Sequence, residues 1–168
     1  MKSLIIYFSH VGQNYMKNGI EEIKKGNTEK LVEMLQKFTN ADIFKVESKN
    51  SYPFNYHECC DVAKEELARD ARPELVEYLN NLDDYKTIYI AGPVWWGHYP
   101  CAMFSLLERL NFDGKTVKFL TTHEGSGLGD TKIDIERFCH GAFISSCLAV
   151  RGCMVEEAEK TLKKWLEK

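Results

Sequence analysis

The sequence predicts an α/β domain in which a five-stranded parallel sheet carries helices on both faces. Short apolar runs alternate along the chain with longer segments that have the period of an amphipathic helix. The first run, residues 4–8, is apolar throughout, as expected of a strand that is covered on both faces. Strands and helices in alternation form parallel βαβ units with right-handed crossovers, so the expected product is an open, doubly wound sheet.

Each element follows from a local pattern. The predicted strands cover 4–8, 42–46, 87–91, 116–120 and 142–150. The predicted helices cover 28–38, 59–67, 102–110, 132–138 and 155–165. A further helix is expected to begin at Pro73, because proline suits the first position of a helix. The Gly92-Pro93 pair is expected to end the third strand. With 168 residues, the chain is expected to form one domain over 1–168.

Charge and hydropathy exclude several classes of protein. The 22 basic and 25 acidic residues are spread along the chain and leave a net charge of −3, which gives no basic stripe for nucleic acid. No segment approaches the roughly 18 apolar residues that span a bilayer. The apolar start of the chain lacks a cleavage site for a signal peptide. We therefore expect a cytoplasmic protein whose first apolar run is a core strand.

The six cysteines indicate neither a disulfide framework nor a zinc site. No C-x-x-C pair occurs, and a chain with this much apolar sequence does not need disulfides for stability. His57 with Cys59 and Cys60, or His98 with Cys101, resembles half of a ligand set, but no second matching pair completes it. We expect reduced thiols, several of them buried as small apolar side chains.

Ligands of doubly wound sheets bind at the carboxyl ends of the strands where the strand order reverses, which directs attention to the loops after the first, third and fourth strands. The first loop begins at Ser9 and ends at Asn27 and Thr28, which are good N-cap residues for the helix that follows. A helix N-terminus is a ready anion site. The loop lacks both G-x-x-x-x-G-K-[ST] and G-x-G-x-x-G, so neither a Walker loop nor an ordinary dinucleotide fold is expected. Ordinary N-capping remains the alternative.

The second loop, residues 92–100, places two adjacent tryptophans and Tyr99 between glycines and prolines. Neighbouring residues on an extended backbone face opposite ways, so one tryptophan is expected to pack inward while the other covers a flat aromatic ligand. The third loop, 121–129, contains three glycines that let the backbone approach the polar edge of a heterocycle. The alternatives are core or interface aromatics for the second loop and a flexible connection for the third. Together the three loops describe a ligand with a phosphate at one end and a planar ring at the other.

At this point the sequence resembles the flavodoxin-like FMN proteins. A bacterial group of that family has a first loop that reads Y-x-S-H-T-G-x-N-Y and resumes at G-N-T, which corresponds here to 7–15 and 26–28. The family's W-W-G-x-x-P loop matches 95–100, and its T-H-E-G-S-G-x-G loop matches 122–129. The resemblance spans essentially the whole chain. It implies a flavodoxin-like three-layer sandwich with strand order 2-1-3-4-5 and FMN as the cofactor.

Two features depart from the pattern. Val11 stands where the family usually has threonine, which removes one hydroxyl from the phosphate loop, and residues 15–25 form an insert relative to ordinary flavodoxins. Gln13-Asn14 and Asn27-Thr28 therefore compete for the phosphate, and we favour Asn27 and Thr28 together with Ser9 and His10. The ring is expected to lie against Trp96 or Tyr99. The full set of residues that the resemblance implies for cofactor binding is Ser9, His10, Val11, Gln13, Asn14, Asn27, Thr28, Pro93, Val94, Trp95, Trp96, Gly97, Tyr99, Thr122, His123, Glu124, Gly125, Ser126 and Gly127.

The flavin itself supplies redox chemistry, so we expect an electron-transfer oxidoreductase, for example an NAD(P)H-dependent enzyme that reduces quinones. The alternative is a non-enzymatic carrier that docks to redox partner proteins, against which the small net charge argues mildly. A sensing or interaction module without turnover is a third class. A homodimer is compatible with the sequence. Neither the second nor the third loop contains lysine or arginine, so a low reduction potential is expected.

Overall fold

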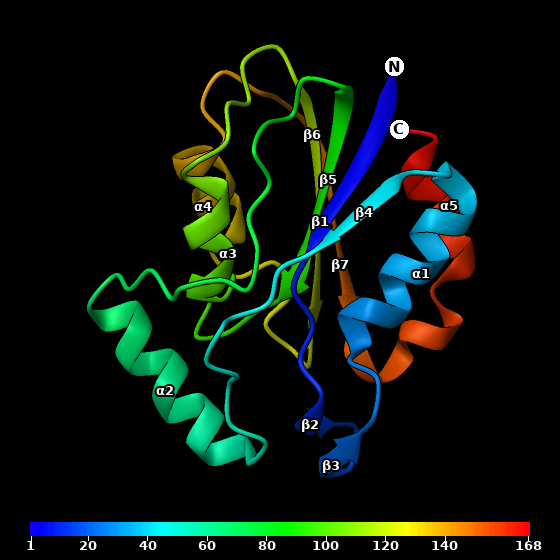
Figure 1. Ribbon diagram of the computed structural model, residues 1–168. Helices are drawn as coiled ribbons and strands as arrows, with labels where there is room; N and C mark the ends of the chain where they lie inside the picture. Colours follow the sequence, from blue (N-terminus) through cyan, green and yellow to red (C-terminus); the bar gives the residue numbers. More distant parts are fainter.

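The computed structural model describes all 168 residues. Five parallel strands form its sheet in the order β4-β1-β5-β6-β7 (Figure 1). In chain order they are β1 (Lys2–Tyr7), β4 (Asp42–Lys45), β5 (Tyr85–Pro93), β6 (Thr116–His123) and β7 (Phe143–Arg151). This is the predicted order, 2-1-3-4-5 counted over the sheet strands alone. The strand order reverses between β1 and β5: the chain continues from β1 to β4 on one side and from β5 to β6 on the other. The loops after β1 and β5 therefore diverge at the carboxyl ends of these two strands.

Strand β1 contributes side chains to two separate cores. Alternate residues of β1 point to opposite faces, so Ile6 joins a buried cluster of 23 residues while Ile5 joins another of 14. Helices α3 (Cys101–Leu107) and α4 (Thr131–Phe138) cover the first face, and α1 (Asn27–Thr39) and α5 (Glu159–Leu166) cover the second (Figure 1). Helix α2 (Tyr56–Ala68) extends outward beyond α3. The predicted three-layer architecture is confirmed.

The insert after β1 folds as a β-hairpin, which the sequence did not predict. Strands β2 (Gly12–Met16) and β3 (Gly19–Ile23) pair in antiparallel fashion and form a second, two-stranded sheet. Figure 1 shows this hairpin beyond the carboxyl end of β1, on the side where α2 begins. The hairpin is tied to the segment before α2, because the Gln13 amide donates to the Phe54 carbonyl over 2.9 Å.

The helix predicted at Pro73 does not form. Residues 73–84 run without regular structure apart from a short antiparallel bridge between Leu75 and Ser48. The Val76 amide donates to the Glu47 carbonyl over 2.9 Å, so the backbone finds its partner in the chain after β4 rather than four residues back. Tertiary pairing thus outweighs the local helix signal. The last predicted helix is also divided, into a 3₁₀ segment η1 (Gly152–Glu157) and α5.

All six cysteines are free thiols, and Cys59, Cys101 and Cys139 are buried, which confirms that several act as small apolar side chains. None of the helices combines the length and the apolar character needed to cross a bilayer.

Candidate functional site

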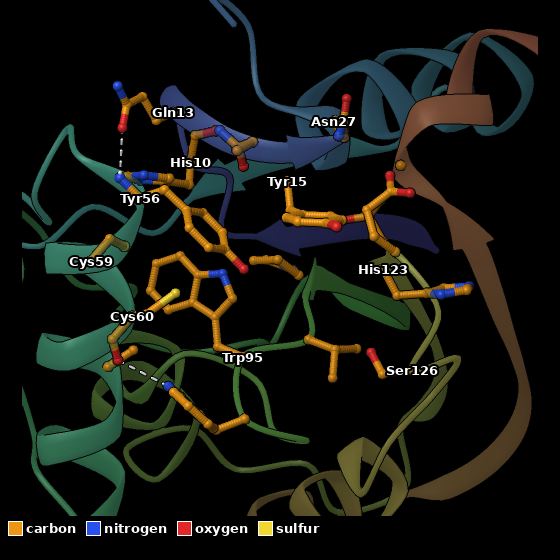
Figure 2. A pocket seen from close by; sticks show the side chains of 18 of the residues that line it. His10, Gln13, Tyr15, Asn27, Tyr56, Cys59, Cys60, Trp95, His123 and Ser126 are labelled. Atoms are coloured by element: carbon orange, nitrogen blue, oxygen red, sulfur yellow. Dashed lines mark hydrogen bonds between the residues drawn. The ribbon is translucent and has the colours of Figure 1, made fainter. Parts of the chain in front are cut away.

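A single large cavity opens at the carboxyl ends of the central strands. Its volume is about 660 Å³, within the range of roughly 300–1,000 Å³ that is usual for cofactor sites. The start of α1 and the loops after β5 and β6 supply one side of it, and the hairpin and α2 supply the other (Figure 2). The lining residues are His10, Gln13, Asn14, Tyr15, Asn27, Thr28, Tyr56, His57, Cys59, Cys60, Asp61, Ala63, Pro93, Val94, Trp95, Trp96, Thr122, His123, Glu124, Ser126 and Gly152.

The N-terminus of α1 forms one end of the cavity. Gly26 occupies the N-cap position and makes no side-chain cap; instead Ser9, which follows β1, accepts a hydrogen bond at Oγ from the Glu29 amide over 3.1 Å. This corrects the expectation that Asn27 or Thr28 caps the helix. Glycine is needed at position 26 because a Cβ there would collide with the Ser9 side chain and with the His10 backbone. The close approach leaves the first amides of α1, which have no intrahelical acceptor, beside the cavity.

Asn27 and Thr28 lie at this end with different hydrogen-bonding states. The Asn27 Oδ1 atom is buried without a partner, and its Nδ2 has only a sulfur acceptor, Met16 Sδ, at 3.3 Å. The Thr28 hydroxyl is 2.6 Å from that of Thr122, which ties α1 to the third loop. Only one hydroxyl proton is used between the two threonines, so the other remains available to a ligand.

Gln13 and Asn14, the competitors for the phosphate, are occupied in holding the first loop together. Gln13 accepts at Oε1 from the Tyr56 amide over 3.0 Å, at the start of α2 (Figure 2). Asn14 donates from Nδ2 to the carbonyls of His10 and Gly12 over 3.2 and 3.3 Å. Both side chains line the cavity. Asn14 uses its Nδ2 donors on the backbone of the loop, whereas Gln13 uses only its carbonyl oxygen.

His10 also lines the cavity, with its ring edge-on to Trp95 at a centroid distance of 5.6 Å. Its Nε2 is buried without a partner, and burial lowers the pKa of the imidazole. The neighbouring Val11 is 48% exposed and does not line the cavity. Ser9 does not line it either; its side chain caps α1 beside the cavity. A buried nitrogen without a partner is a polar group that a ligand would satisfy.

The two tryptophans of the second loop face in different directions. Trp95 packs edge-on against Phe8 and Tyr52, with centroid distances of 5.2 and 4.9 Å. Trp96 is 51% exposed, has a positive φ of 53°, and donates from Nε1 to the Cys60 carbonyl over 2.9 Å. One indole is therefore packed inward and the other lies at the mouth of the cavity, both within its lining.

The expectation for Tyr99 is wrong. Its side chain is 1% exposed, and its hydroxyl donates to the Leu120 carbonyl over 2.7 Å, so the ring belongs to the core under β5 and has no face free for a ligand. Gly97 likewise lies outside the lining, where its carbonyl accepts from the Asp130 amide over 2.6 Å.

A buried carboxylate fixes the tryptophan turn. Trp95 and His98 exchange backbone hydrogen bonds of 2.7 and 3.1 Å across it. Asp134 of α4 then contacts His98 Nδ1 at 2.7 Å and accepts from the Tyr99 amide over 2.9 Å. Burial raises the pKa of Asp134, while the contact with His98 acts in the opposite direction. The turn is thereby attached to α4.

The third loop contributes Thr122, His123, Glu124 and Ser126 to the lining. Gly125 and Gly127 lie outside it, but each has a positive φ, of 134° and 63°, as the predicted glycine-rich turn requires. Glu124 is held by the Cys153 amide, which donates to its Oε1 over 2.6 Å. Burial, and then the charge of Arg151, lowers the pKa of His123.

The sequence analysis missed part of the site. The missed lining residues are Tyr15 of β2, Tyr56, His57, Cys59, Cys60, Asp61 and Ala63 of α2, and Gly152 at the start of η1. The strand-order rule selects the loops after the first, third and fourth strands of the sheet. Helix α2 follows the second strand, β4, and η1 follows the fifth, β7, so the rule does not point to them. For Tyr15, its place directly after the matched Asn14 was an available signal.

The comparisons with known proteins agree with this arrangement. The family model described as flavodoxin matches residues 2–168. A protein designated a flavoprotein from Bacteroides uniformis is 22% identical, with a TM-score of 0.79 over 99% of this chain and 98% of its own. A second from Bacteroides eggerthii is 20% identical, with a TM-score of 0.76 over 99% and 96%. A flavoprotein from Lactobacillus acidophilus, solved in complex with FMN, is 16% identical, with a TM-score of 0.69 over 98% of each chain. No curated protein matches.

Fold and site together define a doubly wound α/β protein with a cavity at the switch point of its sheet. The chain belongs to the flavodoxin family. Membership of that family supports FMN, the cofactor expected from the sequence, and the unsatisfied atoms of His10 and Asn27 are polar groups that such a ligand would meet.

Proposed function

We propose that the chain binds FMN with the phosphate at the N-terminus of α1 and uses it for electron transfer to a small acceptor. The observation that carries the proposal is the make-up of the cavity: the N-terminus of α1 with the unsatisfied Oδ1 of Asn27 lines one part of it, and aromatic side chains line another. A phosphate and a planar ring in one molecule match these two ends.

Four side chains support the phosphate. Ser9 uses an oxygen lone pair to cap α1, which leaves its hydroxyl proton free to donate. The Asn27 Nδ2 would exchange its weak sulfur acceptor for a phosphate oxygen. The hydroxyls of Thr28 and Thr122 share one hydrogen bond, so one of their two hydroxyl protons can be donated to the phosphate. His10, whose Nε2 has no partner, completes the set.

The ring is proposed to lie along Pro93, Val94 and Trp95, with His123 to Ser126 at its polar edge. When bound, FMN supplies the redox chemistry, and these residues position it and exclude water from one side. The structure adds a cation that the loop sequences lack: Arg151 Nη2 is 3.7 Å from the position of a Cβ on Gly125. A cation there favours added negative charge and so works against the low potential expected from the loops alone.

The visible spectrum of the purified protein tests the cofactor. We expect absorption bands of an oxidised flavin, and denaturation should release FMN rather than FAD. A protein that stays colourless after incubation with FMN would contradict the proposal. Turnover is tested by consumption of NAD(P)H in the presence of a quinone, where a rate no higher than that of free FMN would exclude the enzyme.

The carrier remains the second candidate because apolar side chains are exposed on the hairpin and the segment beside it, namely Val11, Ile20 and Phe54. A redox partner protein would cover such residues on docking. The six free thiols support a reducing compartment, and we propose the cytoplasm. A homodimer stays a prediction, which sedimentation measures directly.

A further inference from the structure

The two edges of the sheet differ in how they are protected. Strand β4 forms one edge and β7 forms the other, so each has one side without a neighbouring strand (Figure 1). The free side of an edge strand offers unpaired amides and carbonyls to any other extended chain, and proteins block it with charges, short strands or covering segments. Assembly through such an edge does not depend on the cofactor.

Strand β4 is blocked in each of these ways. It is four residues long, and it begins and ends with the charged residues Asp42 and Lys45. The chain that continues beyond it is covered, because the Val76 amide donates to the Glu47 carbonyl over 2.9 Å. Little of this edge is therefore open to a further strand.

Strand β7 has none of these protections. It is nine residues long, and its first eight residues, F-I-S-S-C-L-A-V, carry no charge. It pairs with β6 on one side, and between Ile144 and Arg151 no backbone hydrogen bond reaches it from a turn or a loop. The Phe143 side chain is 69% exposed, and the Cys147 thiol is exposed as well. A long, uncharged and open edge is a site for pairing with another strand.

A bulge determines which part of β7 can pair. Between Ile144 and Ser146 the register with β6 shifts by one residue. Such a bulge disrupts the ladder locally, so a further strand is expected along the regular stretch 146–151. In that stretch Val150 points into the core that α1 and α5 cover, so Cys147 points to the opposite face of the sheet.

The charges of this stretch favour a second copy of the chain as its partner. In an antiparallel pair related by a two-fold axis, a strand faces its own sequence, so a charge in the middle would meet a like charge. Residues 146–150 carry no charge, and Arg151 stands at the end of the strand. An axis at Leu148 or at Ala149 keeps the two Arg151 side chains apart and pairs five residues of each chain, all within 146–151.

We propose that β7 pairs in antiparallel fashion with β7 of a second copy, so that the two five-stranded sheets join into one. Strands rise about 3.4 Å per residue and lie about 4.8 Å apart. The two Cys147 Cα atoms would therefore lie about 8 Å apart with the axis at Leu148 and about 14 Å apart with the axis at Ala149.

The test combines sedimentation velocity with cross-linking of the exposed thiol. At about 100 µM we expect the protein to sediment with twice the 19.4 kDa mass of one chain. A bifunctional maleimide with a span of about 15 Å should join the two copies through Cys147. Cys147→Ser should abolish the cross-linked product and still sediment as a dimer.

Cys147→Lys should raise the Kd of the dimer at least about tenfold, because it places two like charges close together at the contact. Val76→Lys is the matched control, since Val76 is 62% exposed beside the covered edge. Its Kd should stay within about twofold of the wild-type value.

A wild-type protein that sediments as a monomer would overturn the proposal, and so would a dimer that Cys147→Lys leaves intact. If Cys147→Lys does not fold, the wild-type cross-link decides, because a dimer that gives no product through Cys147 is not paired along β7. Neither result bears on FMN binding, so the proposed function stands or falls by its own test.

Discussion

Gly152 is the position where one methyl group should act on the proposed phosphate site without unfolding the protein. It begins η1, and a Cβ there would lie 2.5 Å from Asn27 Nδ2 and 3.0 Å from Glu124 Oε1. Both atoms are ends of flexible side chains, so Gly152→Ala should displace them at the low end of the cost of overpacking, about 1 kcal/mol in the free energy of unfolding. Asn27 would then turn away from the position that faces the cavity.

The size of the effect follows from what Asn27 does in each state. Without ligand its Nδ2 has only the sulfur of Met16 as acceptor, at 3.3 Å. A hydrogen bond to a charged phosphate contributes about 1.5–3 kcal/mol. Since about 1.4 kcal/mol corresponds to a factor of ten, Gly152→Ala should weaken FMN binding roughly 10- to 100-fold.

The assay is a titration of the apoprotein with FMN, followed by quenching of flavin fluorescence, with thermal unfolding of each apoprotein as the stability control. A double-mutant cycle identifies the cause. If the new methyl group acts through Asn27, then Gly152→Ala should change FMN affinity less than about threefold in an Asn27→Ala background. An equal loss in both backgrounds would refute the reasoning, and would direct attention to Glu124.

Three further predictions concern other contacts. Ser9→Ala removes the cap of α1 and should cost about 1 kcal/mol in urea unfolding of the apoprotein, whereas an unchanged midpoint would show that the contact contributes nothing. The hydrogen bonds from Arg137 and Arg72 hold the pKa of Asp70 well below its usual range, so this stabilisation is present above the unfolded pKa of about 4 and is lost as the pH falls through the folded pKa. Asp70→Asn should therefore lower stability by about 0.5–1 kcal/mol at pH 7 and by less at pH 3, and a difference that does not vary with pH would contradict it. Burial lowers the pKa of His10, and a bound phosphate would raise it, so FMN binding should take up a proton and strengthen from pH 8 to pH 6. A His10→Gln variant with the same pH dependence would exclude this role.

The strands were predictable because each is a short apolar run whose environment is nearly the same on both faces. The run at 4–8 needed no knowledge of its neighbours, and alternate residues of β1 entered the two cores as the pleat requires. The general rule for doubly wound sheets then located the first side of the cavity. These inferences use only local pattern and topology.

The second side of the cavity depends on pairings that no local pattern encodes. The hairpin of β2 and β3 is fixed against α2 by Gln13, whose polar side chain was equally compatible with a phosphate contact. The helix expected at Pro73 failed for the same reason, because Val76 pairs with Glu47, distant in the sequence. Where the partner of a backbone amide lies far along the chain, propensity alone gives the wrong answer.

Tyr99 shows how one turn changes which side chains face a site. The positive φ of Trp96 closes a turn between Trp95 and His98, and both Trp95 and the Tyr99 that follows the turn pack into the same core cluster. Gly92 held the relevant signal. Gly92 and Pro93 are the last two residues of β5, as predicted, and a Cβ on Gly92 would be 2.9 Å from Cδ1 of Tyr99. A glycine inside a buried strand marks a close approach, here of the tyrosine ring that the turn directs into the core.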